Sequence, residues 1–286
     1  MAKHPDCTVL VTSCDAYRDV VGPFATLWRT YWPDCPFETV LLTETQPSEG
    51  FDRVVCTGKG KSWCAMLVEV LDQIDTPYVM MLMNDYYLVR PVDTANVLRR
   101  LEQAKRFDAA NLRLVPNPPG RAPFGAAEEH LREFPKNVAY SVTCQTGFWN
   151  RAYLRGIAAR CRSAWEFERF GSFMVADEPR PLLVTPTQEF PFVDAVHKGY
   201  WEPFGVRALQ ENGIACDFSQ RGRPPLSVRV REALKAFAYA IFPTSLIVRF
   251  QNAVQTRAGR GCADDRRDKC HSPRRARRCS TSRSRS

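Results

Sequence analysis

Hydrophobic positions in the first part of the chain alternate between continuous runs and a helical spacing. Residues 7–12 (CTVLVT), 39–43 (TVLLT) and 78–83 (YVMMLM) are short apolar runs, which predict buried strands. Between these runs, apolar residues recur at the spacing of an amphipathic helix over 20–31 and over 63–74. Strands that alternate with helices in this way predict an α/β fold, in which helices flank a mixed, largely parallel sheet.

The remaining apolar segments continue the same alternation. Further strands are expected at 53–56, 109–115 and 182–185. Further helices are expected at 94–107, with Thr94 as the N-cap, and at 151–161, and another element is expected at 206–212. Residues 116–135 are rich in Pro and Gly, and they predict a mobile loop over the edge of the sheet.

The C-terminal part of the chain has a different composition. Residues 229–242 have the spacing of a basic amphipathic helix, which would either dock on the sheet or lie in a membrane interface. Residues 257–286 contain 11 Lys and Arg against three Asp, so this tail holds +8 of the formal net charge of +9. The sequence therefore predicts a folded domain over 1–225, a C-terminal amphipathic helical segment over 226–256, and a disordered Arg- and Ser-rich tail over 257–286.

The overall composition is that of a globular protein, with 44% hydrophobic and 25% charged residues. No apolar run approaches the ~18 residues of a membrane-spanning helix, and the N-terminus lacks the apolar core of a signal peptide. We therefore expect a cytoplasmic protein, in which only the C-terminal helix and the basic tail are candidates for peripheral contact with the inner face of the membrane.

The eleven Cys include no CxxC pair, which favours reduced thiols over a zinc site. Residues 1–256 carry a net charge of only +1, which argues against nucleic acid as a partner.

Residues 82–88 (LMNDYYL) join the end of a buried strand to polar side chains. In open α/β sheets, ligands bind at the carboxyl ends of the strands, and this strand delivers the carboxylate of Asp85 to that edge. The carboxylate, together with a neutral oxygen from Asn84, suits Mn²⁺ or Mg²⁺ bound to a diphosphate. The alternative interpretation is that Asp85 only caps the turn after the strand.

Several segments of the chain, by their order and spacing, resemble one group of enzymes. They are residues 11–15 (VTSCD), 32–36 (WPDCP), 61–63 (KSW), 82–88, 91–93 (PVD), 165–168 (WEFE) and 198–201 (KGYW). From about Thr8 to Gly213, the chain is similar to bacterial nucleotide-sugar glycosyltransferases with the GT-A fold, from polysaccharide and capsule clusters. That family usually carries two acidic residues where this chain has Asn84 and Asp85, so either Asp85 suffices for the metal or the chain has lost activity.

The resemblance implies that a nucleotide-sugar donor binds at the end of the first strand. Thr12, Ser13 and Asp15 would hold the nucleotide, with Asp15 accepting hydrogen bonds from the base or the ribose. Lys61 would reach a phosphate, and Trp63 would stack on the base or the sugar. The alternatives from the residues alone are that Asp15 is a cap, Lys61 is solvated and Trp63 packs in the core.

A second polar segment contains His197 and Lys198. The resemblance implies that a C-terminal residue completes the metal site, for which His197 is the candidate, while Lys198 would hold the leaving diphosphate; a surface histidine is the alternative. An inverting enzyme also needs a carboxylate base for the acceptor hydroxyl. The resemblance favours residues 165–168 for this role, so that either Glu166 or Glu168 would supply the base; a purely structural helix start is the alternative. On a helix these two glutamates point about 200° apart, so only one would face a cleft, and Glu166 is favoured because Trp165 lies beside it.

The resemblance, taken together with these residues, implies a metal-dependent glycosyltransferase. It would move a hexosyl or N-acetylhexosaminyl group from a nucleotide-diphosphate donor to a glycan or lipid-linked acceptor. A nucleotidyltransferase on a similar fold is one alternative, although residues 13–16 (SCDA) are not the glycine-rich phosphate loop that would favour this class. An inactive glycan-binding or scaffold protein is the other alternative, and Asn84 is its only support in the sequence.

Overall fold

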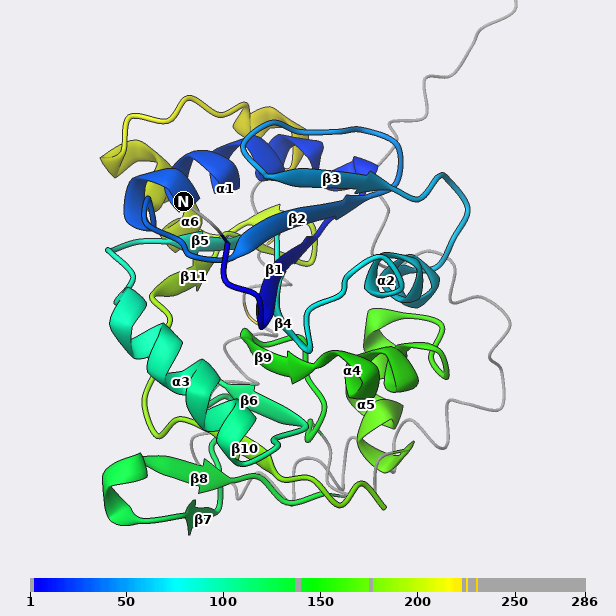
Figure 1. Cartoon of the computed structure of the whole chain (residues 1–286). Helices are drawn as coiled ribbons and strands as arrows, with labels where there is room; N and C mark the ends of the chain where they lie inside the picture. The colour runs from blue at the N-terminus through cyan, green and yellow to red at the C-terminus, as the bar shows by residue number, and fades with distance from the viewer. Residues whose placement is uncertain (1–2, 137–139, 175–176, 223–224, 226–229, 231–286) are drawn as a thin grey trace, which may run out of the picture. The chain divides into compact units, whose positions relative to one another are not determined.

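A nine-stranded sheet, counted over the described residues, organises the larger of the two units into which the chain divides (Figure 1). The structure is a computed structural model, and it describes residues 3–136, 140–174, 177–222, 225 and 230. Of these, 196–201, 217–222, 225 and 230 belong to the smaller unit, and the others belong to the larger unit. The strand order in the sheet is β3-β2-β1-β4-β9-β6-β10-β8-β7.

Four neighbouring strands make up the parallel half of the sheet. They are β1 (Cys7–Thr12), β2 (Glu38–Thr43), β3 (Arg53–Cys56) and β4 (Tyr78–Met83). All four run in the same direction, and Thr12 at the end of β1 lies in register with Leu42 of β2 and Met83 of β4. Their carboxyl ends therefore meet at one edge, which is the edge where open α/β sheets bind ligands.

The other half of the sheet is mixed. Its strands are β9 (Gly147–Asn150), β6 (Asn111–Arg113), β10 (Leu182–Val184), β8 (Leu131–Glu133) and β7 (Ala122–Phe124). β9 lies antiparallel between β4 and β6, and β6 is parallel to β10. Because two antiparallel pairings restore the direction, the carboxyl end of β6 lies at the same edge of the sheet as that of β4.

Helices cover both faces of this sheet. They are α1 (Arg18–Tyr31), α2 (Trp63–Leu71), α3 (Thr94–Arg106), α4 (Arg151–Ala158), α5 (Ala164–Met174) and α6 (Pro203–Glu211). α2, α4 and α5 contact one another over an apolar core that contains Trp149 of β9 (Figure 1). Phe148 alternates with Trp149 and points to the opposite face, where it contacts Phe37, which packs on Trp32 after α1.

Two short strand pairs complete the described elements. In the larger unit, β5 (Tyr86–Leu88) follows β4 directly and pairs antiparallel with β11 (Phe192–Asp194), so that Tyr86 lies opposite Asp194. In the smaller unit, β12 (Val196–His197) and β13 (Tyr200–Trp201) form a hairpin. Three 3₁₀ turns are also present among the described residues, at Asp15–Tyr17, Ala127–Glu129 and Phe218–Gln220.

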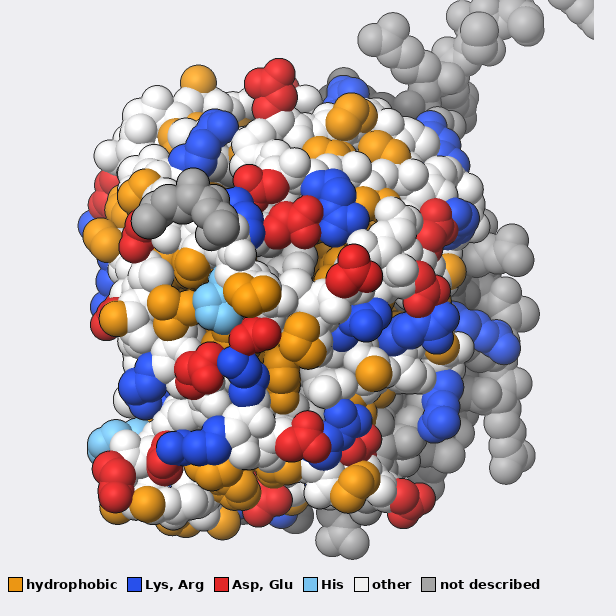
Figure 2. Space-filling model, viewed as in Figure 1, with side chains coloured by type: hydrophobic (Ala, Val, Ile, Leu, Met, Phe, Trp, Pro, Cys, Tyr) orange, Lys and Arg blue, Asp and Glu red, His pale blue; other side chains and the backbone are white. Residues whose placement is uncertain are grey.

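The predicted fold class is confirmed, since helices flank a mixed sheet whose central strands are parallel. The strands expected at 7–12, 53–56 and 78–83 have those bounds in the structure. None of the helices in the described part of the chain combines the length and the apolar character that a membrane crossing requires. On the face seen in Figure 2, Lys and Arg side chains lie among Asp and Glu, in keeping with the nearly neutral charge counted for residues 1–256.

Some expectations need correction or lie outside the described residues. The segment 116–135 contains β7 and β8, because these short strands add to the sheet next to β10. The N-cap of α3 is Asp93, whose side chain accepts from Asn96 N over 2.9 Å, while Thr94 is the first residue of the helix. The helix predicted at 229–242 and the tail at 257–286 lie outside the described residues, apart from Val230. The predicted division at 225 and 256 therefore stays a prediction.

Candidate functional site

The ends of β1 and β4 are joined by side-chain hydrogen bonds at the carboxyl edge of the sheet. Asn84, the first residue after β4, is 3% exposed, and its side-chain amide donates to Ser13 Oγ over 3.1 Å. The same amide donates to the carbonyl of Tyr17 over 3.4 Å. Thr12 Oγ1 is turned toward β4, where it donates to Met83 Sδ over 3.2 Å. Asn84 thus ties the segment after β4 to the segment after β1.

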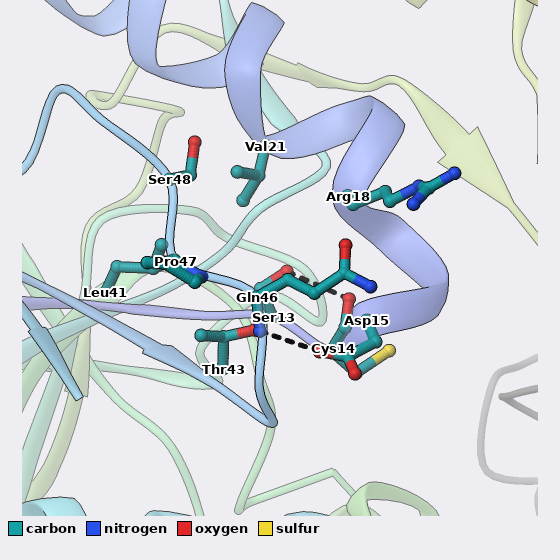
Figure 3. A pocket seen from close by; sticks show the side chains of 10 residues that line it. All are labelled: Ser13, Cys14, Asp15, Arg18, Val21, Leu41, Thr43, Gln46, Pro47 and Ser48. Carbon is teal, nitrogen blue, oxygen red and sulfur yellow. Dashed lines mark hydrogen bonds between the residues drawn. The ribbon is translucent and has the colours of Figure 1, made fainter. Parts of the chain in front are cut away.

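A solvent-accessible pocket opens beside these strand ends (Figure 3). It encloses about 340 Å³ of empty space, counting the open solvent at its mouth. Its lining comes from three segments: Ser13, Cys14 and Asp15 after β1; Leu41, Thr43, Gln46, Pro47 and Ser48 in and after β2; and Arg18 and Val21 on α1. The pocket therefore combines apolar walls with hydroxyl, amide and guanidinium groups, a mixture typical of sites that hold a small polar molecule.

Asp15 binds the loop that forms one wall of the pocket. Its Oδ1 accepts from the backbone N–H groups of Thr45 and Gln46 over 2.9 and 3.1 Å, and its Oδ2 accepts from Thr45 Oγ1 over 2.6 Å. Partial desolvation of Asp15 works against ionisation, but these hydrogen bonds, with the nearby charge of Lys59, lower the pKa of its carboxyl. Asp15 therefore lines the pocket, and its carboxylate orders the loop at 45–46, while its contact with a nucleotide stays a prediction.

Asp85 lies in the turn between β4 and β5, and its Oδ1 is fully buried. Its carbonyl accepts from Ala195 N over 2.7 Å, which brings the end of β11 and its exposed residue Asp194 to the same turn. Burial raises the pKa of the Tyr86 phenol well above its usual value, and the charges of Asp85, Asp194 and Glu168 raise it further. Three carboxylates, from the turn after β4, from β11 and from α5, are thus close enough to act on one buried tyrosine.

Glu166 and Glu168 point to different places, as the helical spacing predicts. Glu168 Oε1 accepts from Cys144 N over 2.8 Å and from Thr143 Oγ1 over 3.2 Å, in the segment that leads into β9. Glu166 Oε2 instead accepts from Arg162 N over 2.7 Å, at the start of α5. The glutamate that faces the carboxyl edge of the sheet is Glu168, whereas the sequence favoured Glu166.

Lys61 and Trp63 do not line the pocket. Lys61 forms an ion pair with Glu69 on α2, and Trp63 packs edge-on against Phe167 at a ring-centroid distance of 5.5 Å. Ser62 is the N-cap of α2, and its Oγ accepts from Ala65 N over 3.2 Å. In the structure, Lys61 and Trp63 therefore have local structural contacts, and their roles toward a donor stay predictions.

His197 and Lys198 belong to the smaller unit. His197 ends β12 and is exposed, and Lys198 lies in the hairpin turn with a φ of 51°. Glycine follows at 199 with a φ of 81°, so two successive left-handed residues make this tight turn. The proposed metal and diphosphate contacts of His197 and Lys198 stay predictions.

One group of three potential metal ligands occurs among the described residues: His4, Asp6 and Glu102. Lys105 Nζ already binds two of them, at 2.6 Å from Asp6 Oδ2 and 2.8 Å from Glu102 Oε1. Asp6 directly precedes β1, so this group lies at the amino ends of the parallel strands. It is therefore remote from the carboxyl edge that carries Asp85.

Arg18 and Gln46 line the pocket, and the sequence reasoning missed both. Gln46 lies three residues after β2, and Arg18 begins α1. Neither residue belongs to a motif. The available signal was the parallel order of the first two strands, because parallel neighbours end at the same edge and bring residues 43–46 beside residues 12–15.

Comparison with solved structures finds chains of similar fold at low sequence identity. A 2-C-methyl-D-erythritol 4-phosphate cytidylyltransferase from Thermus thermophilus is 17% identical, over 73% of this chain and 100% of that chain, with a TM-score of 0.44. TarS from S. aureus is 12% identical over 64% of this chain, which spans 37% of the TarS chain, with a TM-score of 0.40. TarS 1–349 in complex with UDP-GlcNAc is 12% identical, over 53% of this chain and 47% of that chain, with a TM-score of 0.34. No family model and no curated protein sequence matches the chain.

Proposed function

We propose that this chain is a metal-dependent glycosyltransferase that uses a nucleotide-diphosphate sugar as its donor. The observation that carries the proposal is the hydrogen bond between Asn84 and Ser13, over 3.1 Å. It fixes the strand end that bears Asp85 against the wall of the pocket after β1. A nucleotide in that pocket would extend its diphosphate toward Asp85 along the carboxyl edge of the sheet.

The pocket residues suit the nucleoside part of such a donor. Val21, Leu41 and Pro47 offer apolar contact to a base, while Ser13 and the exposed side chain of Gln46 offer hydrogen bonds. The Asp15 carboxylate holds the loop that carries Gln46, so its role toward the donor would be to position this wall of the pocket. Arg18 is exposed at the pocket and would add a positive charge near a phosphate.

The ligands proposed for a divalent cation are carboxylates near Tyr86. Asp85 and Asp194 reach the same turn from β4 and β11, and oxygen ligands of this kind suit Mn²⁺ or Mg²⁺. When bound, the ion would neutralise the diphosphate leaving group. Asp85 is the ligand we propose first, since it lies in the turn that follows β4, and His197 stays a second candidate from the sequence.

Glu168 is the better placed candidate for the base that deprotonates an acceptor hydroxyl. It reaches the segment before β9, at the edge that also carries Asp85, and its charge acts on Tyr86. Glu166 is bound to the start of its own helix. A glycan or lipid-linked acceptor, and peripheral membrane contact through the C-terminal helix and tail, follow from the sequence resemblance and its charge pattern alone.

A panel of nucleotide-diphosphate sugars, incubated with the full chain and Mn²⁺, tests this proposal. We expect at least one donor to release a nucleoside diphosphate, and to do so only when the divalent ion is present. The Asp85→Asn variant should not release it. The matched control is Asp72→Asn, an exposed carboxylate that pairs with Arg155, which should keep the activity. Pyrophosphate release from a nucleoside triphosphate and a sugar phosphate would instead identify a nucleotidyltransferase. No binding of any nucleotide would overturn both enzyme functions and leave a scaffold role.

A further inference from the structure

Arg113, the last residue of β6, is a fully buried arginine without an acidic partner among the described residues. Its side chain has 0% exposure, and Nη1 donates to the Tyr140 carbonyl over 3.4 Å. Nε and Nη2 are both buried, and neither finds a hydrogen-bond partner in the described part of the chain. Desolvation lowers the pKa of Arg113 to about 9, so the side chain is still a cation at neutral pH. A buried, incompletely bonded charge of this kind is costly unless something satisfies it.

The two nitrogens without a partner, Nε and Nη2, form one edge of the guanidinium group. Elsewhere in this chain, that same edge binds the two oxygens of a carboxylate. The pairs are Arg53–Glu38, Arg100–Glu189, Arg155–Asp72 and Arg180–Glu178. This two-pronged geometry is the one that arginine offers to carboxylate and phosphate groups. Arg113 presents the same Nε–Nη2 edge in the interior of the protein.

Among the described residues, the neighbours of Arg113 bring no negative charge to it. Its cross-strand neighbours are Gly147 on β9, which has no side chain, and Val184 on β10, which is apolar. The ring of Phe134 lies under the guanidinium, with 4.2 Å between Cζ and the ring centroid. Ser141, next to Tyr140, adds a hydroxyl that is also fully buried and has no partner among the described residues.

From this geometry we infer that Arg113 binds a small oxyanion, of carboxylate or phosphate type, at the end of β6. The anion would accept hydrogen bonds from Nε and Nη2 of Arg113. The hydroxyl of Ser141, the residue after Tyr140, would be a further donor. Tyr140 adopts a φ of 65°, which is unusual for a residue with a side chain, and its carbonyl fixes the opposite side of the guanidinium. The site is separate from the pocket after β1, and the inference does not depend on sugar transfer.

Thermal unfolding of the full chain in different anions tests this inference. Inorganic phosphate or acetate should raise the Tm of the parent protein in a saturable manner, by roughly 3–6 °C at ten times Kd, relative to chloride at equal ionic strength. Arg113→Met should abolish the response. Arg155→Met, which removes an exposed arginine, should keep it. Equal responses in the parent and Arg113→Met, or no response beyond chloride in the parent, would overturn the inference.

Two further measurements keep the test decisive if Arg113→Met does not fold. Arg113→Lys keeps the charge but lacks the two-pronged edge, so it should bind phosphate at least tenfold more weakly than the parent in calorimetric titration. An unchanged affinity in Arg113→Lys contradicts the proposed geometry.

Titration of the parent with glucose 1-phosphate distinguishes the two sources of the anion. Binding as strong as that of inorganic phosphate assigns the site to a phosphate group of a substrate. Weaker binding assigns the site to a free ion.

Discussion

Glu168 accepts a hydrogen bond from the backbone N–H of Cys144 over 2.8 Å, while Tyr86 Oη donates to the carbonyl of the same residue over 3.4 Å. The peptide groups of Cys144 are thus held between α5 and the start of β5. We expect Glu168→Gln to lower kcat by about 10²- to 10⁴-fold, because the amide can still accept from Cys144 but cannot take a proton. Steady-state kinetics with the donor identified in the panel measure this. Donor affinity and Tm should stay near those of the parent.

Two control variants separate the chemistry of Glu168 from its structural contact. Glu168→Ala loses both, so its Tm should fall together with kcat. Glu166→Gln should keep kcat, because the Glu166 carboxylate accepts from Arg162 N at the start of α5. If Glu168→Gln turns over like the parent, the base lies elsewhere, or the reaction retains configuration and does not need a base from α5.

Asn84→Asp should destabilise the protein rather than strengthen metal binding. From the sequence alone, a carboxylate at this position is expected to bind a metal ion more strongly than the Asn84 amide. In the structure, however, the amide nitrogen faces the Tyr17 carbonyl, and a carboxylate cannot donate to it. We expect a loss of about 1–3 kcal/mol in the free energy of unfolding, measured with urea. A variant as stable as the parent, with tighter Mn²⁺ binding, would contradict this account of Asn84.

The long apolar runs were predictable because their environment is simple. β1 and β4 lie in the interior of the sheet and are buried along almost their whole length, so residues 7–12 and 78–83 are mostly apolar on both faces. The four residues of β9 were not predictable, since GFWN has no alternation and its place between β4 and β6 depends on contacts distant in the sequence. The short strands β7 and β8 were missed for the same reason.

The candidate site was predictable in part. The position of Asp85 and Ser13 at one edge follows from the parallel strands that precede them. The role of Glu166 could have been found from local sequence, because Ser163 lies three residues before it, and this spacing is typical of a capping box. In the structure, Glu166 N donates to Ser163 Oγ over 3.2 Å. The buried Arg113 could not be predicted, since a single arginine after two residues of a strand gives no sign of its burial.

Asp15 should contribute to stability in a pH-dependent manner. Its pKa is lowered in the folded protein from the usual 3.8, so its contribution is present above about pH 4 and is lost as the pH falls through the folded-state pKa. Asp15→Asn should therefore flatten the dependence of the urea midpoint on pH below about pH 4. The exposed Asp75→Asn variant should keep the profile of the parent. A profile unchanged by Asp15→Asn would show that the contacts with Thr45 and Gln46 do not contribute to stability.

Glu189→Gln should be among the more destabilising single changes outside the site. Glu189 binds Nε and Nη2 of Arg100, whose side chain is only 1% exposed, and it also accepts from Asn96 Nδ2 over 2.8 Å. Removal of the negative charge leaves a buried guanidinium without a counter-charge, which costs about 3–5 kcal/mol in the free energy of unfolding. Urea denaturation measures this loss. Glu211→Gln is the matched control, since Glu211 pairs with Arg207 at 59% exposure and should change stability by less than about 1 kcal/mol. Losses of equal size in the two variants would mean that burial does not determine the strength of the Arg100–Glu189 pair.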